Sequence, residues 1–289
     1  MSNPENEWPL SDWHSQAQAE YQDYFGTSIV STYGRLPIEY ASMYRSAGVF
    51  DMAQRGVISV TGEDRASFLN SLLTAELVER DSGKSIPPGQ ARFSFLLDRK
   101  GRVLAEMNVL VADDRILLEL DRRLIADVSK ELERYHFREK VDFTADDDLS
   151  VIGVLGPGAA RLVREATGID AVELQDNTGR TSGSVSAWRT DLGTVAMYLV
   201  VVPRAELVAT WGRLVADKKS AVAIGWAALN AVASRPVVAC SASITTTRFS
   251  RPRRGSSSGP SASPRGVTRG RRSSPACMRA TSTPGSSCN

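Results

Sequence analysis

Two kinds of hydrophobic pattern alternate along residues 37–232. Short apolar runs predict buried strands, and apolar residues at helical spacing predict amphipathic helices. Up to residue 143 their order is β-α-β-β-β-α-β, close to a ferredoxin-like plait with one added strand. The segments in this order are Val57–Thr61, a helix in DRASFLNSLLT, Phe93–Leu97, Val103–Val111, Ile116–Leu120, Asp121–His136 and Val141–Phe143.

A shorter series of the same kind follows from residue 151. It consists of a strand at Val151–Leu155, a helix at Ala159–Thr167, strands at Ser184–Arg189 and Val195–Val202, and a helix at Arg204–Asp217. We therefore predict an α+β fold built from two tandem ferredoxin-like plaits, at about residues 37–147 and 148–232.

The first 36 residues are predicted to form a helical N-terminal segment. Residues 8–26 read as one helix that ends at Gly26. The sequence MSNPENEWPL lacks the basic and apolar regions of a secretory signal, and no run approaches the roughly 18 apolar residues of a membrane span. These features predict a cytoplasmic protein without a membrane partner.

Charge divides the chain at Val232. Residues 233–289 contain ten arginines and no Lys, Asp or Glu, so the first 232 residues hold 25 basic and 33 acidic side chains. All three cysteines also lie beyond Val232, which excludes a disulfide framework or cysteine-based zinc site before it. The Arg-, Ser- and Pro-rich tail is too poor in apolar residues to offset its ordering entropy, and we expect it to be disordered.

Candidate chemistry in the body is sparse. His14 and His136 are the only histidines, and both are expected to be structural, His136 at a helix end where a cation is favoured. Glu106 interrupts the apolar run VLAEMNVLV. The pattern alone favours an outward-facing strand position for Glu106. The alternative is an acid at a pocket mouth that hydrogen-bonds a heterocycle or takes a proton.

Four short motifs occur in a consistent order: A-G-V-F-D at 47–51, V-T-G at 60–62, D-R-K-G-R at 98–102 and G-P at 156–157. From about Pro37 to Val232 the chain resembles the aminomethyltransferase (glycine cleavage T-protein) superfamily, in particular its YgfZ-type folate-binding branch. The resemblance implies two plaits and a C-terminal β-barrel arranged as a ring. It also implies tetrahydrofolate or a one-carbon derivative in the central channel.

The same resemblance implies a set of site residues. Glu106 falls where T-proteins have an Asp near the reactive nitrogens of the folate, and it is the candidate catalytic residue. Phe93 falls where an aromatic ring stacks near the pterin, and Tyr198 falls near a pterin-anchoring Glu. The remaining folate-binding candidates, placed by alignment alone, are Arg55, Asn108 and Arg189.

The YgfZ-type branch carries a later motif, K-G-C-Y-x-G-Q-E, which the tail lacks as translated. Read one base out of frame, codons for residues 264–272 allow K-G-C-Y-P-G-Q-E. Codons for residues 232–254 allow R-V-E-A-G-R-G-V-F-G-V-D-Y-D-D-T-L-L-P-A-E-T-G. We infer a frameshift at or near Val232, which would remove the C-terminal barrel and impair function.

Three functions follow from these observations. The first is a folate-binding protein, more plausibly not an enzyme, that acts in iron–sulfur cluster assembly or repair with iron–sulfur client proteins as partners. The second is a folate-dependent aminomethyltransferase, which the replacement of Asp by Glu106 and of Glu by Tyr198 disfavours. The third is non-specific nucleic-acid binding through the tail, at Arg269, Arg271 and Arg272, which we regard as a side effect of composition.

Overall fold

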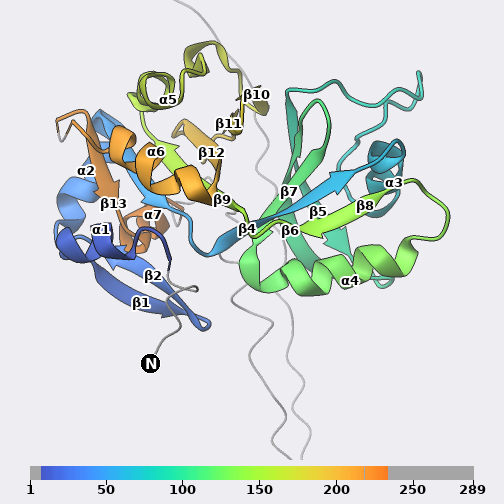
Figure 1. The fold of residues 1–289 in the computed structure, drawn as a ribbon, viewed down its shortest axis with the longest axis horizontal. Helices are drawn as coiled ribbons and strands as arrows, with labels where there is room; N and C mark the ends of the chain where they lie inside the picture. The colour runs from blue at the N-terminus through green and yellow to red at the C-terminus, as the bar shows by residue number, and fades with distance from the viewer. Residues whose placement is uncertain (1–7, 218, 234–289) are drawn as a thin grey trace, which may run out of the picture. The chain divides into compact units, whose positions relative to one another are not determined.

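The computed structural model describes residues 8–217 and 219–233. The expected tail therefore lies outside the described residues from position 234 onward, as do its three arginine candidates for nucleic-acid binding. Within the described ranges, a sheet of 11 strands is covered by helices, and a separate two-stranded hairpin lies near the N-terminus (Figure 1). A mixed α+β fold is thereby confirmed.

The first half of the sheet has the predicted order of elements. Strand β4 lies between β7 and β8, and β5 and β6 extend the sheet beyond β7. The hairpin between β5 and β6 turns at Gly101, whose φ of +73° lies in the left-handed region. The elements are β4 (Arg55–Thr61), α3 (Arg65–Leu72), β5 (Gln90–Leu97), β6 (Val103–Val111), β7 (Ile116–Asp121), the 3-10 turn η2 (Arg122–Leu124), α4 (Ile125–Tyr135) and β8 (Asp142–Ala145).

The second half also combines antiparallel strands with helices, but one of its strands, β3 (Ala47–Asp51), comes from a part of the chain that precedes the first half. Strand β3 falls within the predicted bounds of the first plait, but it lies between β13 and β9, parallel to the former and antiparallel to the latter. The two halves join where β10 meets β5. The elements are β9 (Leu149–Leu155), α5 (Ala159–Thr167), η3 (Ala171–Glu173), β10 (Thr178–Ser182), β11 (Val185–Arg189), β12 (Met197–Pro203), η4 (Arg204–Glu206), α6 (Leu207–Leu214), β13 (Ala221–Ile224) and α7 (Trp226–Ala233).

The prediction of one helix over residues 8–26 is wrong. Helix α1 (Ser11–Gln16) is short, and β1 (Glu20–Tyr24) and β2 (Thr27–Thr32) form an antiparallel hairpin before α2 (Leu36–Arg45). Phe25 and Gly26 make the turn with φ angles of +52° and +92°, as a two-residue hairpin loop requires. Gly26 is thus a hairpin residue rather than the end of a helix.

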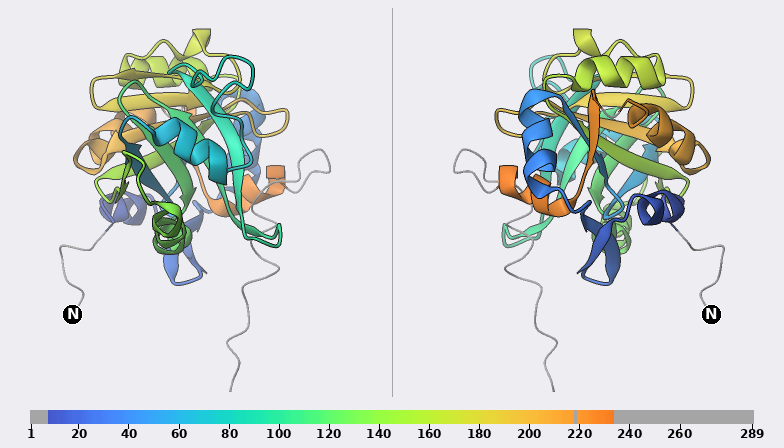
Figure 2. Two further views of the ribbon diagram at one scale, coloured as in Figure 1. Left: turned by 90° about the vertical axis from the view of Figure 1, so that its right-hand side faces the viewer. Right: turned by 90° about the vertical axis from the view of Figure 1, so that its left-hand side faces the viewer.

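The buried hydrophobic side chains form three clusters, which lie on the two faces of the sheet. In the first half, α3 and α4 cover one face, and the left view of Figure 2 shows them in front of the strands. In the second half, α5, α6 and α1 pack on the corresponding face. The opposite faces of both halves contribute to a single cluster, with α2 and α7 at its edge. We call this shared side the inner face; it carries Val57, Ala91, Leu110, Leu117, Trp188, Leu199 and Val201.

Candidate functional site

Glu106 lies on the inner face of the first half and is buried. Only 7% of the residue is exposed, so the expectation that it faces solvent is wrong. Side chains alternate along β6, so Glu106 shares a face with Asn108 and Leu110, whereas Met107 and Val109 enter the cluster under α3 and α4. The charge therefore sits on the side that both halves share.

Arg55 links Glu106 to a second buried carboxylate, Glu119. Arg55 Nε donates to Glu119 Oε1, and Nη2 donates to Oε2 at 2.9 Å and to the Glu119 carbonyl oxygen at 3.2 Å. Arg55 Nη1 lies 3.9 Å from Glu106 Oε1. Burial alone would lower the pKa of Arg55, but the charge and hydrogen bonds of Glu119, aided by Glu106 and Asp121, raise it above its usual range. The guanidinium is a fixed cation shared among carboxylates.

Asn108 and Phe93 complete the group. Asn108 Nδ2 donates to Glu119 Oε2 at 2.7 Å. Phe93 lies opposite Asn108 in the β5–β6 ladder, and Phe95 lies opposite Glu106. The two rings meet edge to face at 5.1 Å, and Phe93 remains 49% exposed. The structure thus brings four of the six sequence-predicted residues together on three strands, β4, β5 and β6 (Figure 1).

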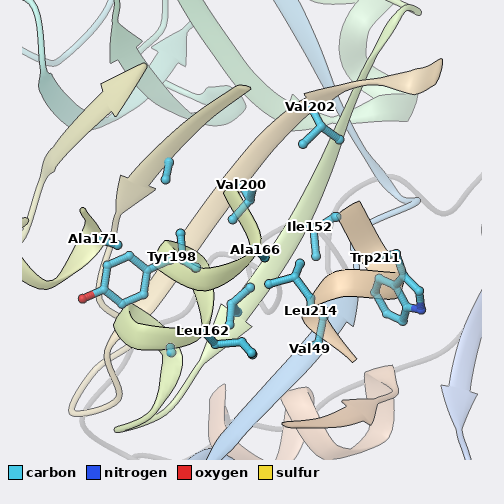
Figure 3. Close-up of a cluster of buried hydrophobic side chains, with 14 of the residues drawn as sticks. Val49, Ile152, Leu162, Ala166, Ala171, Tyr198, Val200, Val202, Trp211 and Leu214 are labelled. Carbon is cyan, nitrogen blue, oxygen red and sulfur yellow. The ribbon is translucent and has the colours of Figure 1, made fainter. Parts of the chain in front are cut away.

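Arg189 and Tyr198 do not join this group. They are paired across β11 and β12, but they lie on the outer side of the sheet. Tyr198 is buried beside Leu162 and Ala171, as Figure 3 shows. Arg189 donates to both carboxylate oxygens of Asp191 at 2.9 Å and to the Leu174 carbonyl oxygen at 3.1 Å.

The comparison of Tyr198 with a pterin-anchoring Glu therefore does not apply to this group. The β12 side chains on the inner face are instead Met197, Leu199 and Val201. All three are apolar, so no described side chain of β12 offers a carboxylate on the inner face.

Sequence reasoning missed Glu119 and Asp121, although their signal was present. Both interrupt the apolar strand ILLELD, as Glu106 interrupts its own strand. Asp121 accepts from Tyr24 Oη at 3.0 Å and pairs with Arg123 at 2.6 Å. Burial, followed by the charge of Asp121, raises the pKa of Tyr24 to about 12. The hydrogen bond from Tyr24 to Asp121 holds the tip of the β1–β2 hairpin next to Arg55, which pairs with Asp121 across β4 and β7.

The two histidines have separate settings. His14 is buried between Asp51 Oδ2 and Tyr33 Oη, each 2.9 Å from a ring nitrogen, and Trp8 Nε1 donates to the same Asp51 oxygen at 2.7 Å. Sequence reasoning did not foresee this network. His136 follows α4 and contacts the Glu139 carbonyl oxygen at 2.8 Å, a structural setting. In the ranges that the structure covers, no cluster of His, Cys, Asp or Glu could hold a metal ion.

The group can hold a planar ligand by two kinds of contact. Carboxylate and amide oxygens accept hydrogen bonds from N–H groups, and the exposed Phe93 ring offers an apolar surface for stacking.

Among the described residues, no helix is long and apolar enough to cross a membrane.

Comparison with known proteins agrees with the fold. The chain is 26% identical over 211 residues to an aminomethyltransferase of Methylococcus capsulatus, a match that covers 71% of this chain and 56% of that protein. The glycine cleavage system aminomethyltransferase T from Bartonella henselae superposes with a TM-score of 0.69 at 22% identity, covering 78% of this chain and 60% of that one. The chain thus spans somewhat more than half the length of these relatives. The family model for the GCVT N-terminal domain matches residues 10–231, and the chain belongs to this family.

Proposed function

We propose that the group around Glu106 binds tetrahydrofolate or a one-carbon derivative. The observation that carries the proposal is the grouping of Arg55, Glu106 and Asn108 beside the exposed ring of Phe93, in a chain of this family. The hydrogen-bond acceptors suit the N–H groups of a pterin, and the phenyl ring suits its flat surface. The names of the relatives, both aminomethyltransferases, are consistent with a folate ligand.

For the biological role, we propose a YgfZ-type, non-enzymatic function in cytoplasmic iron–sulfur cluster assembly or repair, with iron–sulfur proteins as clients. Its support is the Glu at position 106 in place of Asp and the apolar inner side of β12. The alternative is one-carbon transfer as a folate-dependent aminomethyltransferase, which the names of the relatives favour.

We also propose that a frameshift near Val232 separates this chain from an ancestral frame that encoded the YgfZ-type motif. Its support is the out-of-frame decoding of residues 232–254 and 264–272 together with the absence of acidic residues beyond Val232. Sequencing the locus tests this proposal. An intact reading frame with no family motif in the neighbouring frame would contradict it.

Calorimetric titration of the full chain with tetrahydrofolate tests the binding proposal. Replacing Phe93 by Ala removes the stacking surface and should weaken binding roughly two- to tenfold, since an aromatic pair contributes about 0.5–1.5 kcal/mol. Phe137 is a matched control. It is also a phenylalanine with an exposed side chain, 81% exposed, but it lies on the loop after α4 and not in the group around Glu106. Phe137→Ala should bind as the unaltered chain does. Absence of binding by the unaltered chain would refute the proposal.

Two assays on the full chain and on a frame-restored chain separate the roles. A methylene-transfer assay with tetrahydrofolate as acceptor should show no turnover if the protein is non-enzymatic. Recovery of an iron–sulfur enzyme's activity in cells lacking the endogenous protein should occur with the frame-restored chain. Turnover without such recovery would favour the aminomethyltransferase.

A further inference from the structure

Glu119 occupies the centre of the group around Glu106. It lies on β7, opposite Asn108 on β6 and Val57 on β4, and the residue has no solvent-exposed surface. A buried carboxylate is costly unless it is paired and hydrogen-bonded. The buried Glu119 carboxylate therefore needs its hydrogen-bond partners to be stable, and it holds the side chains of those partners in place.

The partners of Glu119 are two of the proposed ligand-binding residues. Its two oxygens take up Nε and Nη2 of Arg55, which leaves Nη1 as the guanidinium nitrogen near Glu106. A guanidinium is planar and rigid, so fixing two of its nitrogens fixes the third. The orientation of Arg55 towards Glu106 is thus set from the opposite side, by Glu119.

Glu119 also decides which way the Asn108 amide is turned. Its Oε2 lies 2.7 Å from Asn108 Nδ2. An ionised carboxylate can only accept hydrogen bonds, so the amide nitrogen must face it and the amide oxygen must face away. Asn108 is half-buried, and it therefore presents an acceptor on the side away from Glu119.

We propose that Glu119 is the positioning residue of this site: it orients Arg55 towards Glu106 and turns Asn108 so that the Asn108 amide oxygen offers a hydrogen-bond acceptor to a ligand edge rich in N–H donors. The inference rests on the proposed folate binding for the identity of the ligand. The orientation of the two side chains can be tested without ligand.

A double-mutant cycle tests the inference. Glu119→Gln replaces one acceptor oxygen by an NH2 group of the same size, so one N–H group of Arg55 or Asn108 that bonded to Glu119 is left facing a donor. Tetrahydrofolate binding should weaken about tenfold or more, as expected when a hydrogen bond to a charged group is lost. Asn108→Asp alone opposes two carboxylates and should also weaken binding.

The two changes together should restore binding in part. In Glu119→Gln/Asn108→Asp the new NH2 group can donate to the new carboxylate, whose other oxygen offers an acceptor to the ligand, whereas Arg55 Nη2 loses its bond to Oε2. Affinity above the value that adding the two single losses predicts is expected, because one hydrogen bond to a charged group is recovered. A purely structural role for Glu119 predicts instead that the two losses add. Glu165→Gln, on the exposed surface of α5, is the control and should leave binding unchanged.

Nitrogen-15 NMR of the unliganded chain gives a second measurement. The Asn108 side-chain amide, assigned by its loss in Asn108→Asp, should exchange slowly with solvent and exchange faster in Glu119→Gln, where its acceptor is no longer charged. Urea unfolding of each variant verifies that it is folded. If the unaltered chain binds no folate but the amide is protected, the proposed function fails and the positioning role stands. Additive losses in the cycle, or an unprotected amide, would overturn the positioning role.

Discussion

Replacing Glu39 should reveal how strongly one buried carboxylate ties the N-terminal segment to the end of the second half. Glu39 has no exposed surface. Its Oε1 accepts from Thr32 Oγ1 at 2.7 Å and from the backbone N–H groups of Tyr33 and Arg35 at 2.8 and 3.3 Å. Its Oε2 accepts from the backbone N–H of Gly225 at 2.9 Å. One side chain thus joins the end of β2 and the start of α2 to the β13–α7 turn.

The expected losses follow from which of these donors water can reach. In Glu39→Ala the fully buried Gly225 N–H loses its acceptor, at a cost of about 1–3 kcal/mol, and the three part-buried donors lose bonds to a charged group. We expect a total of about 3–5 kcal/mol. Glu39→Gln keeps an oxygen for the first three donors and turns its NH2 towards Gly225, so about 1–3 kcal/mol is expected.

Urea unfolding of the full chain, followed by tryptophan fluorescence, measures both losses, with comparable m-values as the check that unfolding stays cooperative. Glu165→Gln is the control because it changes an exposed helical Glu, and it should stay within about 0.5 kcal/mol of the unaltered chain. If both Glu39 variants were no less stable than this control, or if the Gln variant lost as much as the Ala variant, the assignment of the bonds would be wrong.

Three further predictions concern stability. Gly156→Ala should cost about 2–4 kcal/mol in urea unfolding, because φ is +113° and an added Cβ would meet a backbone oxygen at 2.7 Å; an unchanged midpoint would contradict this. Asp51→Ala leaves the buried His14 ring and the half-buried Trp8 Nε1–H without their acceptor and should cost about 2–4 kcal/mol, whereas His14→Gln should cost less; equal losses would argue against Asp51 as the centre of the network. Burial opposes the ionisation of Asp121, but its bonds to Arg123 lower its pKa below the usual 3.8. The ionised Asp121 therefore stabilises the folded state at pH values above 3.8, and this contribution is lost as the pH falls below about 4. Asp121→Asn should flatten the corresponding decline in acid unfolding curves.

The pattern of apolar residues predicted the first half well because each of its strands pairs with a neighbour from the same stretch of chain. It failed at the N-terminus, where Phe25-Gly26 was taken for a helix end; the short alternating segments on either side are the signal of a hairpin. It could not reveal that β3 pairs in the second half, because pairing between distant segments leaves no local periodicity.

The alternation of side chains along strands could predict which of the candidate residues share a face of the sheet. Glu106 and Asn108 are two residues apart on one strand and therefore share a face, and Phe93 is the cross-strand neighbour of Asn108. Tyr198 lies on the outer face because a single position along a strand decides which face a side chain occupies, and its neighbour Leu199 is on the inner face. The role of Glu119 depended on a three-dimensional contact with Arg55 that spacing alone does not encode.

The insertion of β3 has a consequence for how the molecule assembles. Strand β13 finds its partner not in the helix-strand unit just before it but in β3, made before the entire first half. A fragment that began after β8 would lack the strand that bridges β13 to β9, so β13 would have lost its native partner and β9 would have an unpaired edge. During synthesis β3 must wait for both of its neighbours, and such long loop closures slow folding. The two halves are thus interlocked in the order of the gene, and cutting the chain between them would not yield two independently folding pieces.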